Sequence, residues 1–335
     1  MLQRISTACQ RATWQRELAE AIRDPAELLA ILNLPVTLLA GTRAASREFP
    51  LRVPHGFVAR MHKSDVNDPL LRQVLPLAAE FDNPPGFDND PVGDLAATTE
   101  KGVLHKYHGR VLAVATGACG VHCRYCFRRH FPYRYNNAGV DGWESLLTYI
   151  QQDDTITEVI LSGGDPLTIS DRRLAGFTQR LASIPRVKRL RIHSRLPIVI
   201  PSRIDDDLLD WIGNARLQVV IVLHANHANE IDHEVGAAAR RLRDIGVTLL
   251  NQSVLLKGVN DSVTVLARLS ETLFEIGILP YYLHLLDRVR GAAHFEVEEP
   301  LAVDLITALR RLLPGYLVPR LVREIDGRPA KFIVK

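Results

Sequence analysis

The sequence RVLAVATGACGVHCRYCFRRH, residues 110–130, joins a short apolar run to a loop rich in cysteine and arginine. The run at 110–116 has the composition of a buried strand. Three cysteines follow it directly, Cys119, Cys123 and Cys126, with the spacing C-x3-C-x2-C. Structural metal sites use four protein ligands, whereas catalytic sites keep one coordination position open. Three thiols on one loop therefore indicate an open metal centre at the end of a strand.

Five further strand candidates follow, and amphipathic stretches such as 170–184, 229–246 and 261–277 lie between them. The strand candidates are residues 158–163, 189–194, 218–225, 248–256 and 280–286. Six consecutive βα units predict a parallel sheet in an α/β fold. Because a barrel of eight units fills about 250 residues, the shorter span 108–300 predicts a partial (β/α)6 barrel.

The first hundred residues carry helix signals of another kind. Asp24 precedes Pro25 and an apolar helical pattern, and Asn67 or Asp68 repeats this arrangement before residues 69–80. The stretch DNPPGFDNDPVGD (82–94) is rich in turn-forming residues and predicts an irregular connection. We therefore expect a helical extension at 1–95, the barrel at 96–315 and a C-terminal segment at 316–335.

Composition narrows the class of protein. The chain has 335 residues, 47% hydrophobic and 24% charged, with a formal charge of only +3. This balance favours neither nucleic acid nor an anionic membrane as a partner, and no apolar run of about 18 residues predicts a membrane span. Four cysteines with three in one cluster are not a disulfide framework, which favours the cytoplasm, with Cys9 an ordinary thiol.

Polar and glycine-rich groups follow most of the strand candidates. In parallel βα architectures ligands bind beyond the carboxyl ends of the strands. These groups are therefore expected to converge on one site. They are Cys119, the pair Gly163 and Gly164 with Asp165, the pair Ser194 and Arg195, the stretch HANHANE at 224–230, and Asp287.

The cysteine loop fits an iron–sulfur cluster better than zinc, although His122 or His130 could supply a fourth zinc ligand. With Tyr125 before its last cysteine, the loop resembles the signature of radical S-adenosylmethionine (SAM) enzymes. The resemblance implies a [4Fe-4S] cluster on Cys119, Cys123 and Cys126 whose fourth iron binds SAM. One electron from the cluster then cleaves SAM to a 5′-deoxyadenosyl radical.

Two more motifs match the SAM site of that family. Gly163, Gly164 and Asp165 resemble its Gly-Gly-acid motif, which implies that they hold the amino group of SAM; alone, they would also make an ordinary turn. Ser194 and Arg195 stand where the carboxylate of SAM would bind, since a guanidinium fork suits a carboxylate. A solvated surface arginine is the alternative.

The chain resembles one branch of these enzymes, the lysine 2,3-aminomutases, over most of its length. The motifs HKYHGRVL, CGVHCRYCFRRHF, LSGGDPLTISD, NQSVLLKGVND and YYLHLLDRVRGAAHF carry the resemblance. It implies a second cofactor, pyridoxal phosphate (PLP), bound to Lys331 after a turn at Gly327; Lys335 is the competing lysine. The resemblance assigns the other PLP contacts to Lys106, Tyr107, Arg110 and Gln252.

The same resemblance assigns the substrate contacts. Arg128 matches the residue that binds the substrate carboxylate, and Asp287 matches an acid that binds the ε-ammonium of lysine. The second acid is Glu324, with Asp326 as an alternative.

The short C-terminal end resembles the bacterial members that convert L-α-lysine to (R)-β-lysine for the modification of elongation factor P. A reductase or flavodoxin-type electron donor and a ligase acting on elongation factor P are the implied partners. Three alternatives stay open: an aminomutase acting on glutamate, an enzyme of free-lysine metabolism, or a non-catalytic iron–sulfur or zinc module.

Overall fold

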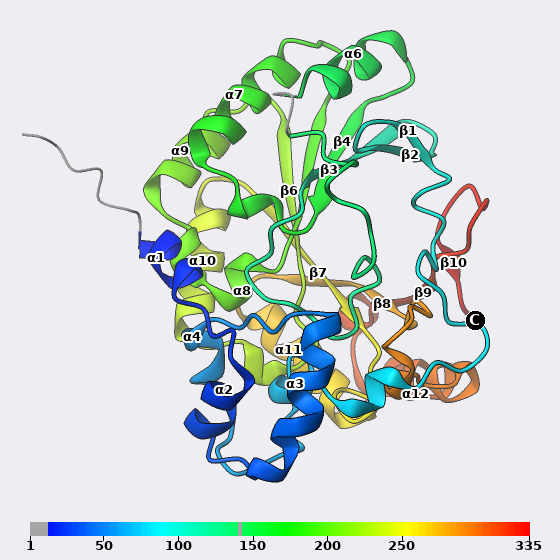
Figure 1. The fold of residues 1–335 in the computed structure, drawn as a ribbon. Helices are drawn as coiled ribbons and strands as arrows, with labels where there is room; N and C mark the ends of the chain where they lie inside the picture. Colours follow the sequence, from blue (N-terminus) through cyan, green and yellow to red (C-terminus); the bar gives the residue numbers. More distant parts are fainter. Residues whose placement is uncertain (1–12, 140–142) are drawn as a thin grey trace, which may run out of the picture.

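The computed structural model describes residues 13–139 and 143–335, so the expectation for Cys9 lies outside the described residues. One ten-stranded sheet runs through the molecule with its strands in chain order, β1 to β10 (Figure 1). Its six central strands are mutually parallel. They are β3 (Arg110–Thr116), β4 (Glu158–Gly163), β5 (Arg189–Ser194), β6 (Gln218–Leu223), β7 (Thr248–Val254) and β8 (Leu279–His284).

All six expected strands are present, and the first three have the expected bounds. The last three end two residues earlier than expected, because the chain leaves the ladder to form the site. At the end of β6, for example, the main-chain N–H of Ala225 donates at 2.9 Å to the side chain of Asn251 on the neighbouring strand β7, and not to a main-chain carbonyl of that strand. The polar side chains after these strands therefore belong to loops.

Four strands at the two ends of the sheet were not expected. β1 (Thr98–Glu100) and β2 (Val103–Tyr107) add antiparallel strands before β3. At the other end β9 (Arg320–Arg323) pairs parallel to β8, and β10 (Phe332–Ile333) pairs antiparallel to β9. These strands are short and lack a clear apolar alternation, so periodicity does not reveal them. Among the described residues no pairing joins β1 to β10, and the sheet is open.

Helices follow the strands and cover the sheet (Figure 1). The helices after the strands are α6 (Glu144–Gln152), α7 (Asp171–Ala182), α8 (Leu196–Val199), α9 (Asp206–Gly213), α10 (His233–Asp244), α11 (Val263–Glu275) and α12 (Glu299–Leu312). The amphipathic predictions for α7, α10 and α11 are confirmed. The core lies between these helices and fully buried strand residues, among them Val111, Val159, Leu190 and Ile221.

The N-terminal helices lie at the lower left of Figure 1. They are α1 (Thr13–Ala19), α2 (Pro25–Ile31), α3 (Leu39–Glu48), α4 (His55–Val58) and α5 (Pro69–Arg72). Asp24 caps α2 as expected, accepting from the N–H of Ala26 at 3.0 Å. Asp68, and not Asn67, caps α5, which is a single turn. Residues 82–94 form no helix or named strand, as expected.

The N-terminal segment also holds the cysteine loop in place. The N–H of His122 donates to the carbonyl of Arg52, and the N–H of Arg124 donates to the carbonyl of Gln73, both at 2.9 Å. The buried guanidinium of Arg124 donates to Glu80 from Nε at 2.7 Å and from Nη2 at 2.5 Å. These contacts come from the loops that join and follow the N-terminal helices, and they hold the cysteine loop from behind.

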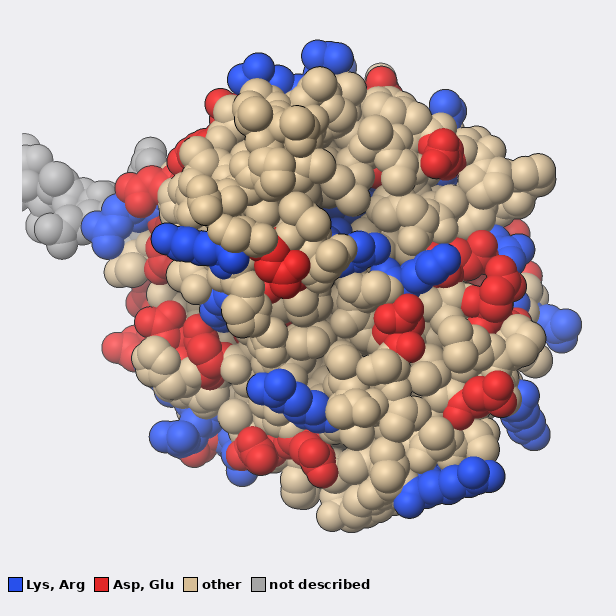
Figure 2. Space-filling model, turned by 90° about the horizontal axis from the view of Figure 1, so that it is seen from below, with Lys and Arg blue, Asp and Glu red and all other residues tan. Residues whose placement is uncertain are grey.

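Positive and negative side chains are interspersed on the face shown in Figure 2. Within the described residues, no helix has both the length and the apolar character that crossing a membrane requires.

Candidate active site

A cavity of about 490 Å³ opens at the carboxyl ends of the parallel strands. The cysteine loop, the ends of β4 to β8, the β2–β3 hairpin and the β9–β10 hairpin line it. Every residue assigned to the site from the sequence lines this one cavity, while its individual role stays a prediction. They are Lys106, Tyr107, Arg110, Cys119, Cys123, Cys126, Arg128, Gly163, Gly164, Asp165, Ser194, Arg195, Gln252, Asp287, Glu324 and Lys331.

The three cysteines of the loop are free thiols on the same wall. Burial, together with the charge of Cys123, raises the pKa of Cys126 to about 11, and burial raises the pKa of Cys119 well above its usual range. Three thiolates therefore need positive charge among them, which the irons of an iron–sulfur cluster supply. This donor set fits such a cluster. No group of three or more His, Cys, Asp or Glu among the described residues is arranged to hold a single metal ion, so the fit to a cluster rests on the type of donor and on the short loop that the three thiols share.

The two glycines after β4 allow the cysteine loop to approach the sheet. Gly163 has φ +119°, and a Cβ there would lie 2.6 Å from the carbonyl oxygen of Thr116. A Cβ on Gly164 would collide with the carbonyl of Ala118. Instead, the N–H of Gly164 donates to Thr116 at 2.7 Å. The two glycines thus let the turn after β4 lie directly against the start of the cysteine loop, next to Cys119.

Asp165 joins the loops after β4 and β5. Its Oδ1 accepts from the Ser194 hydroxyl at 2.7 Å and from the N–H of Leu167 at 3.1 Å. Its Oδ2 accepts from the N–H groups of Arg195 and Leu196 at 2.8 and 2.9 Å. Burial nevertheless raises the pKa of this carboxyl. All four bonds are internal to the chain, so a contact between Asp165 and a ligand ammonium would have to replace one of them.

A series of ion pairs links residues that line the cavity. Arg128 Nε lies 2.6 Å from Asp94 Oδ2, and Asp94 Oδ1 lies 2.6 Å from Lys106 Nζ. Lys106 continues to Glu324 at 3.0 Å, and Glu324 reaches Lys331 Nζ at 2.7 Å. The hairpin that carries Lys331 is therefore tied by charge to the segment that carries Arg128.

This ion chain affects two assignments. Burial raises the pKa of Glu324, but the ammonium groups of Lys331 and Lys106 outweigh burial and lower it to about 2. Lys106 also donates to the carbonyl of Val92 at 2.7 Å, so its three donors are used within the chain. Arg110 forms none of the ion pairs found among the described residues, and its guanidinium lies 4.8 Å from the Tyr107 ring centre. Arg110 is therefore the better placed of the two for a phosphate.

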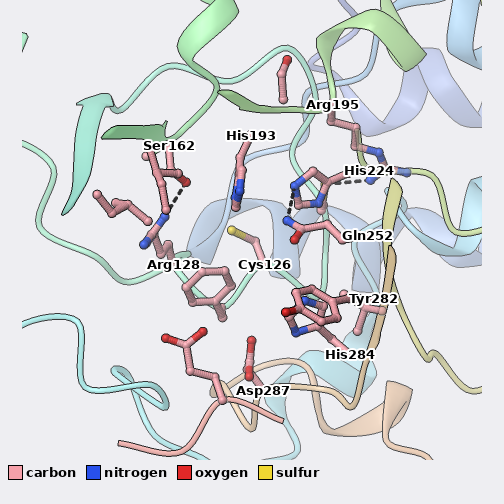
Figure 3. A pocket seen from close by; sticks show the side chains of 18 of the residues that line it. Cys126, Arg128, Ser162, His193, Arg195, His224, Gln252, Tyr282, His284 and Asp287 are labelled. Atoms are coloured by element: carbon pink, nitrogen blue, oxygen red, sulfur yellow. Dashed lines mark hydrogen bonds between the residues drawn. The ribbon is translucent and has the colours of Figure 1, made fainter. Parts of the chain in front are cut away.

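Asp287 follows β8 and faces the cavity (Figure 3). No side-chain hydrogen bond or ion pair is formed by it among the described residues. Burial raises its pKa to about 7, although the charge of Lys331 acts in the opposite direction. Asp287 could therefore pair with a cationic group of a ligand.

Two alternative residues named from the sequence do not line the cavity. Asp326, the alternative to Glu324, is exposed, and so is Lys335, the alternative to Lys331.

Three histidines that line the cavity had no role assigned from the sequence: His284, which is buried, and His193 and His224, which are partly buried (Figure 3). Burial lowers the pKa of His224 to about 3 and holds those of His193 and His284 well below the usual range, so all three are neutral. His224 Nε2 lies 2.6 Å from Gln252 Nε2. Neither His193 Nε2 nor His284 Nε2 has a hydrogen-bond partner in the part of the chain that the structure describes. Their positions at the ends of strands were the available signal.

Comparison with known proteins identifies relatives along almost the whole chain. It is 50% identical to an L-lysine 2,3-aminomutase of Escherichia coli (strain K12), over 96% of this chain and 94% of that protein. It is 48% identical to one of Haemophilus influenzae (96% and 95%) and 32% identical to one of Clostridium subterminale (95% and 76%).

Other comparisons are weaker. A radical SAM methyltransferase structure from Sphaerobacter thermophilus matches with a TM-score of 0.45 and 17% identity, over 66% of this chain and 68% of that one. No protein-family model matches. The identity and coverage of the relatives show that this chain belongs to the family of L-lysine 2,3-aminomutases, which are isomerases.

Proposed function

We propose that this protein converts L-α-lysine to (R)-β-lysine in a radical reaction that needs a [4Fe-4S] cluster, SAM and PLP. One observation carries the proposal. A single cavity is lined by three free thiols, by Lys331 of the β9–β10 hairpin, and by Asp287, an acid with no ion-pair partner among the described residues. The three thiols would bind the iron–sulfur cluster, the amine of Lys331 would bind PLP, and Asp287 would bind the ε-ammonium of the substrate lysine.

The cofactors supply radical generation and a π-system for migration of the amino group, and the chain supplies position and charge. Lys331 is the residue that would hold PLP. Its ammonium is paired with Glu324 at 2.7 Å, and a lysine must lose its proton before it can act as a nucleophile. Glu324 and Lys106 remain to balance charge when Lys331 becomes neutral. Arg110 and Gln252 would contact the phosphate and the ring.

The substrate would lie between two groups of opposite charge. Arg128 would bind its carboxylate in a bidentate contact. In the present structure Asp94 and the Ser162 hydroxyl accept from Arg128 at 2.6 and 2.9 Å, which holds the guanidinium toward the cavity. Asp287 would pair with the ε-ammonium, which would keep this acid ionised at neutral pH. Glutamate has no cation for Asp287, which favours lysine.

The test begins with anaerobically reconstituted full-length protein. About four irons per chain are expected, together with an imine absorbance of PLP that Lys331→Ala abolishes and Lys335→Ala retains. Lysine, SAM and a reductant should then yield β-lysine. One bound zinc and no imine absorbance would refute the proposal. Formation of β-glutamate from glutamate, without β-lysine, would refute the assignment of the substrate.

We further propose a cytoplasmic enzyme whose product modifies elongation factor P and whose electrons come from a reductase or flavodoxin-type donor. Identity with relatives along the chain supports the reaction, whereas these partners rest on the resemblance of the motif VPRLVREIDGRPAK (318–331) to the bacterial enzymes. A coupled assay with elongation factor P and its ligase should add the mass of one β-lysine. Chiral chromatography of the product should give the (R) form, and the (S) form would contradict the proposal.

The finer architecture is also a proposal. The six parallel strands β3 to β8 would form a partial (β/α)6 barrel within residues 96–315. Residues 1–95 would form the helical extension and residues 316–335 the segment that carries Lys331. The order of the strands and the cavity at their carboxyl ends support this division.

A further inference from the structure

Arg195 lies behind the cysteine loop with its guanidinium fixed by four acceptors. Nη1 donates to Cys123 Sγ at 2.7 Å and to the Tyr125 hydroxyl at 2.8 Å. Nη2 donates to Gln73 Oε1 at 2.6 Å and to Glu230 Oε2 at 3.0 Å. The side chain is only 6% exposed. A fixed positive charge therefore lies in direct contact with one of the three thiols.

Gln73 brings the N-terminal segment into this arrangement. It is fully buried, and its Nε2 donates to Glu230 Oε1 and to the carbonyl of Pro69, both at 3.0 Å. Its own carbonyl accepts from the N–H of Arg124, the neighbour of Cys123, at 2.9 Å. One residue thus holds the cysteine loop through its main chain and Arg195 through its side chain.

The remaining members close the network. Asn226 Nδ2 donates to Gln73 Oε1 at 2.9 Å and to the Tyr125 hydroxyl at 2.6 Å. The N–H of Asn226 donates to Glu230 at 2.8 Å. Buried polar networks in which the members are satisfied make a site rigid. Both Nη atoms of Arg195 have partners, whereas its Nε has none within residues 13–139 and 143–335.

We propose that Gln73 is a positioning residue that holds Arg195 against Cys123 and thereby raises the reduction potential of the cluster. This rests on the proposed cluster. Hydrogen bonds to the sulfurs and nearby positive charge favour the reduced state, which carries one more electron. The role differs from a contact with the SAM carboxylate, since both Nη atoms of Arg195 are already used by the chain.

The test compares Gln73→Met and Arg195→Met with Gln179→Met, a matched change on the exposed face of α7. Each full-length protein is reconstituted anaerobically, and its midpoint potential is measured without SAM by titration followed by electron paramagnetic resonance. We expect Gln73→Met to disfavour one-electron reduction about tenfold, about 59 mV more negative. Arg195→Met should give a larger shift in the same direction, and the control none.

The affinity for SAM separates this role from direct binding. Gln73→Met should leave SAM binding, measured by equilibrium dialysis, within about twofold of wild type. Unchanged potentials in variants that hold a full complement of iron would overturn the inference. So would weaker SAM binding by Arg195→Met with an unchanged potential.

The two variants differ in how strongly they disturb the fold. Arg195→Met leaves the buried Glu230 without its cation, whereas Gln73→Met keeps that pair and decides the question alone. A wild-type protein that takes up no cluster would refute the proposed function and this inference together; an unchanged potential refutes the inference alone.

Discussion

Asp287 is a partly buried acid with no ion-pair partner among the described residues, and its replacement by Asn separates the energetic cost of this acid from its use in the reaction. The pKa of Asp287 rises from 3.8 to about 7, mainly through burial. At about 1.4 kcal/mol per pKa unit, ionisation costs the folded protein at most about 4 kcal/mol. Because Asp287 is only partly buried and lines the cavity, solvent screening reduces this cost to about 2 kcal/mol.

The sign follows from linkage. An acid whose pKa is higher in the folded state destabilises the protein as pH rises from about 4 to about 7, and the full cost persists above that range. Asp287→Asn should therefore make the cofactor-free protein about 2 kcal/mol more stable at pH 8 and leave it unchanged at pH 4. Urea denaturation at both pH values measures this, with the exposed Asp304→Asn as the control.

The same change should weaken the reaction with lysine. Loss of one partner of a buried ion pair costs about 2 to 5 kcal/mol, so kcat/KM for lysine should fall about 30-fold to about 4,000-fold. Norleucine, which has the same carbon chain without the ε-ammonium, should show no such loss. Equal losses for both substrates would refute the reasoning, since Asp287 would then act on the shape of the cavity.

Three further changes test other parts of the site. Glu324→Gln removes an acid whose pKa is lowered to about 2, so the free energy of unfolding at pH 7 should fall by about 2 to 3 kcal/mol. The difference from wild type should disappear as pH falls from about 4.5 to about 2. An equal difference at pH 2 and pH 7 would contradict this. Gly163→Ala places a Cβ 2.6 Å from the Thr116 carbonyl oxygen at a positive φ, and it should reduce iron uptake several-fold. Gly176 has open space around it, so Gly176→Ala should leave iron uptake unchanged. Equal uptake by the two variants would show that the loop tolerates displacement. Asp165→Asn replaces an acceptor of four hydrogen bonds and should cost about 2 to 4 kcal/mol in urea denaturation; a cost below about 0.5 kcal/mol would mean that the two loops are held together by other contacts.

Prediction from the sequence was most accurate where a structural feature depends only on residues that are neighbours in the sequence. The runs that became β3, β4 and β5 were bounded correctly, because apolar alternation and turn residues act over a few positions. The cap of α2 was likewise local. The cap of α5 had two candidates, Asn67 and Asp68, and only the folded backbone distinguished them.

The site divides in the same way. The sequence placed polar groups at the ends of parallel strands, and this sufficed to bring Cys119, Asp165 and Asp287 into one cavity. It did not reveal Asp94 or Gln73. Both lie in the N-terminal segment and act on partners that are far away in the sequence, Arg128 and Arg195, through single contacts that leave no periodic trace.

The sequence by itself determined the order of the parallel strands, the three thiols on one loop and the lysine near the C-terminus, because each follows from neighbouring residues. Only the tertiary structure decided which charges meet. Lys106 pairs with Asp94 and Glu324, whereas Arg110 forms no ion pair among the described residues. Glu324 pairs with Lys331, and Asp326 does not line the cavity. The physical reason is that an ion pair depends on a distance of a few ångströms between atoms, and only folding sets such a distance between Lys106 and Glu324, which are 218 residues apart in the sequence.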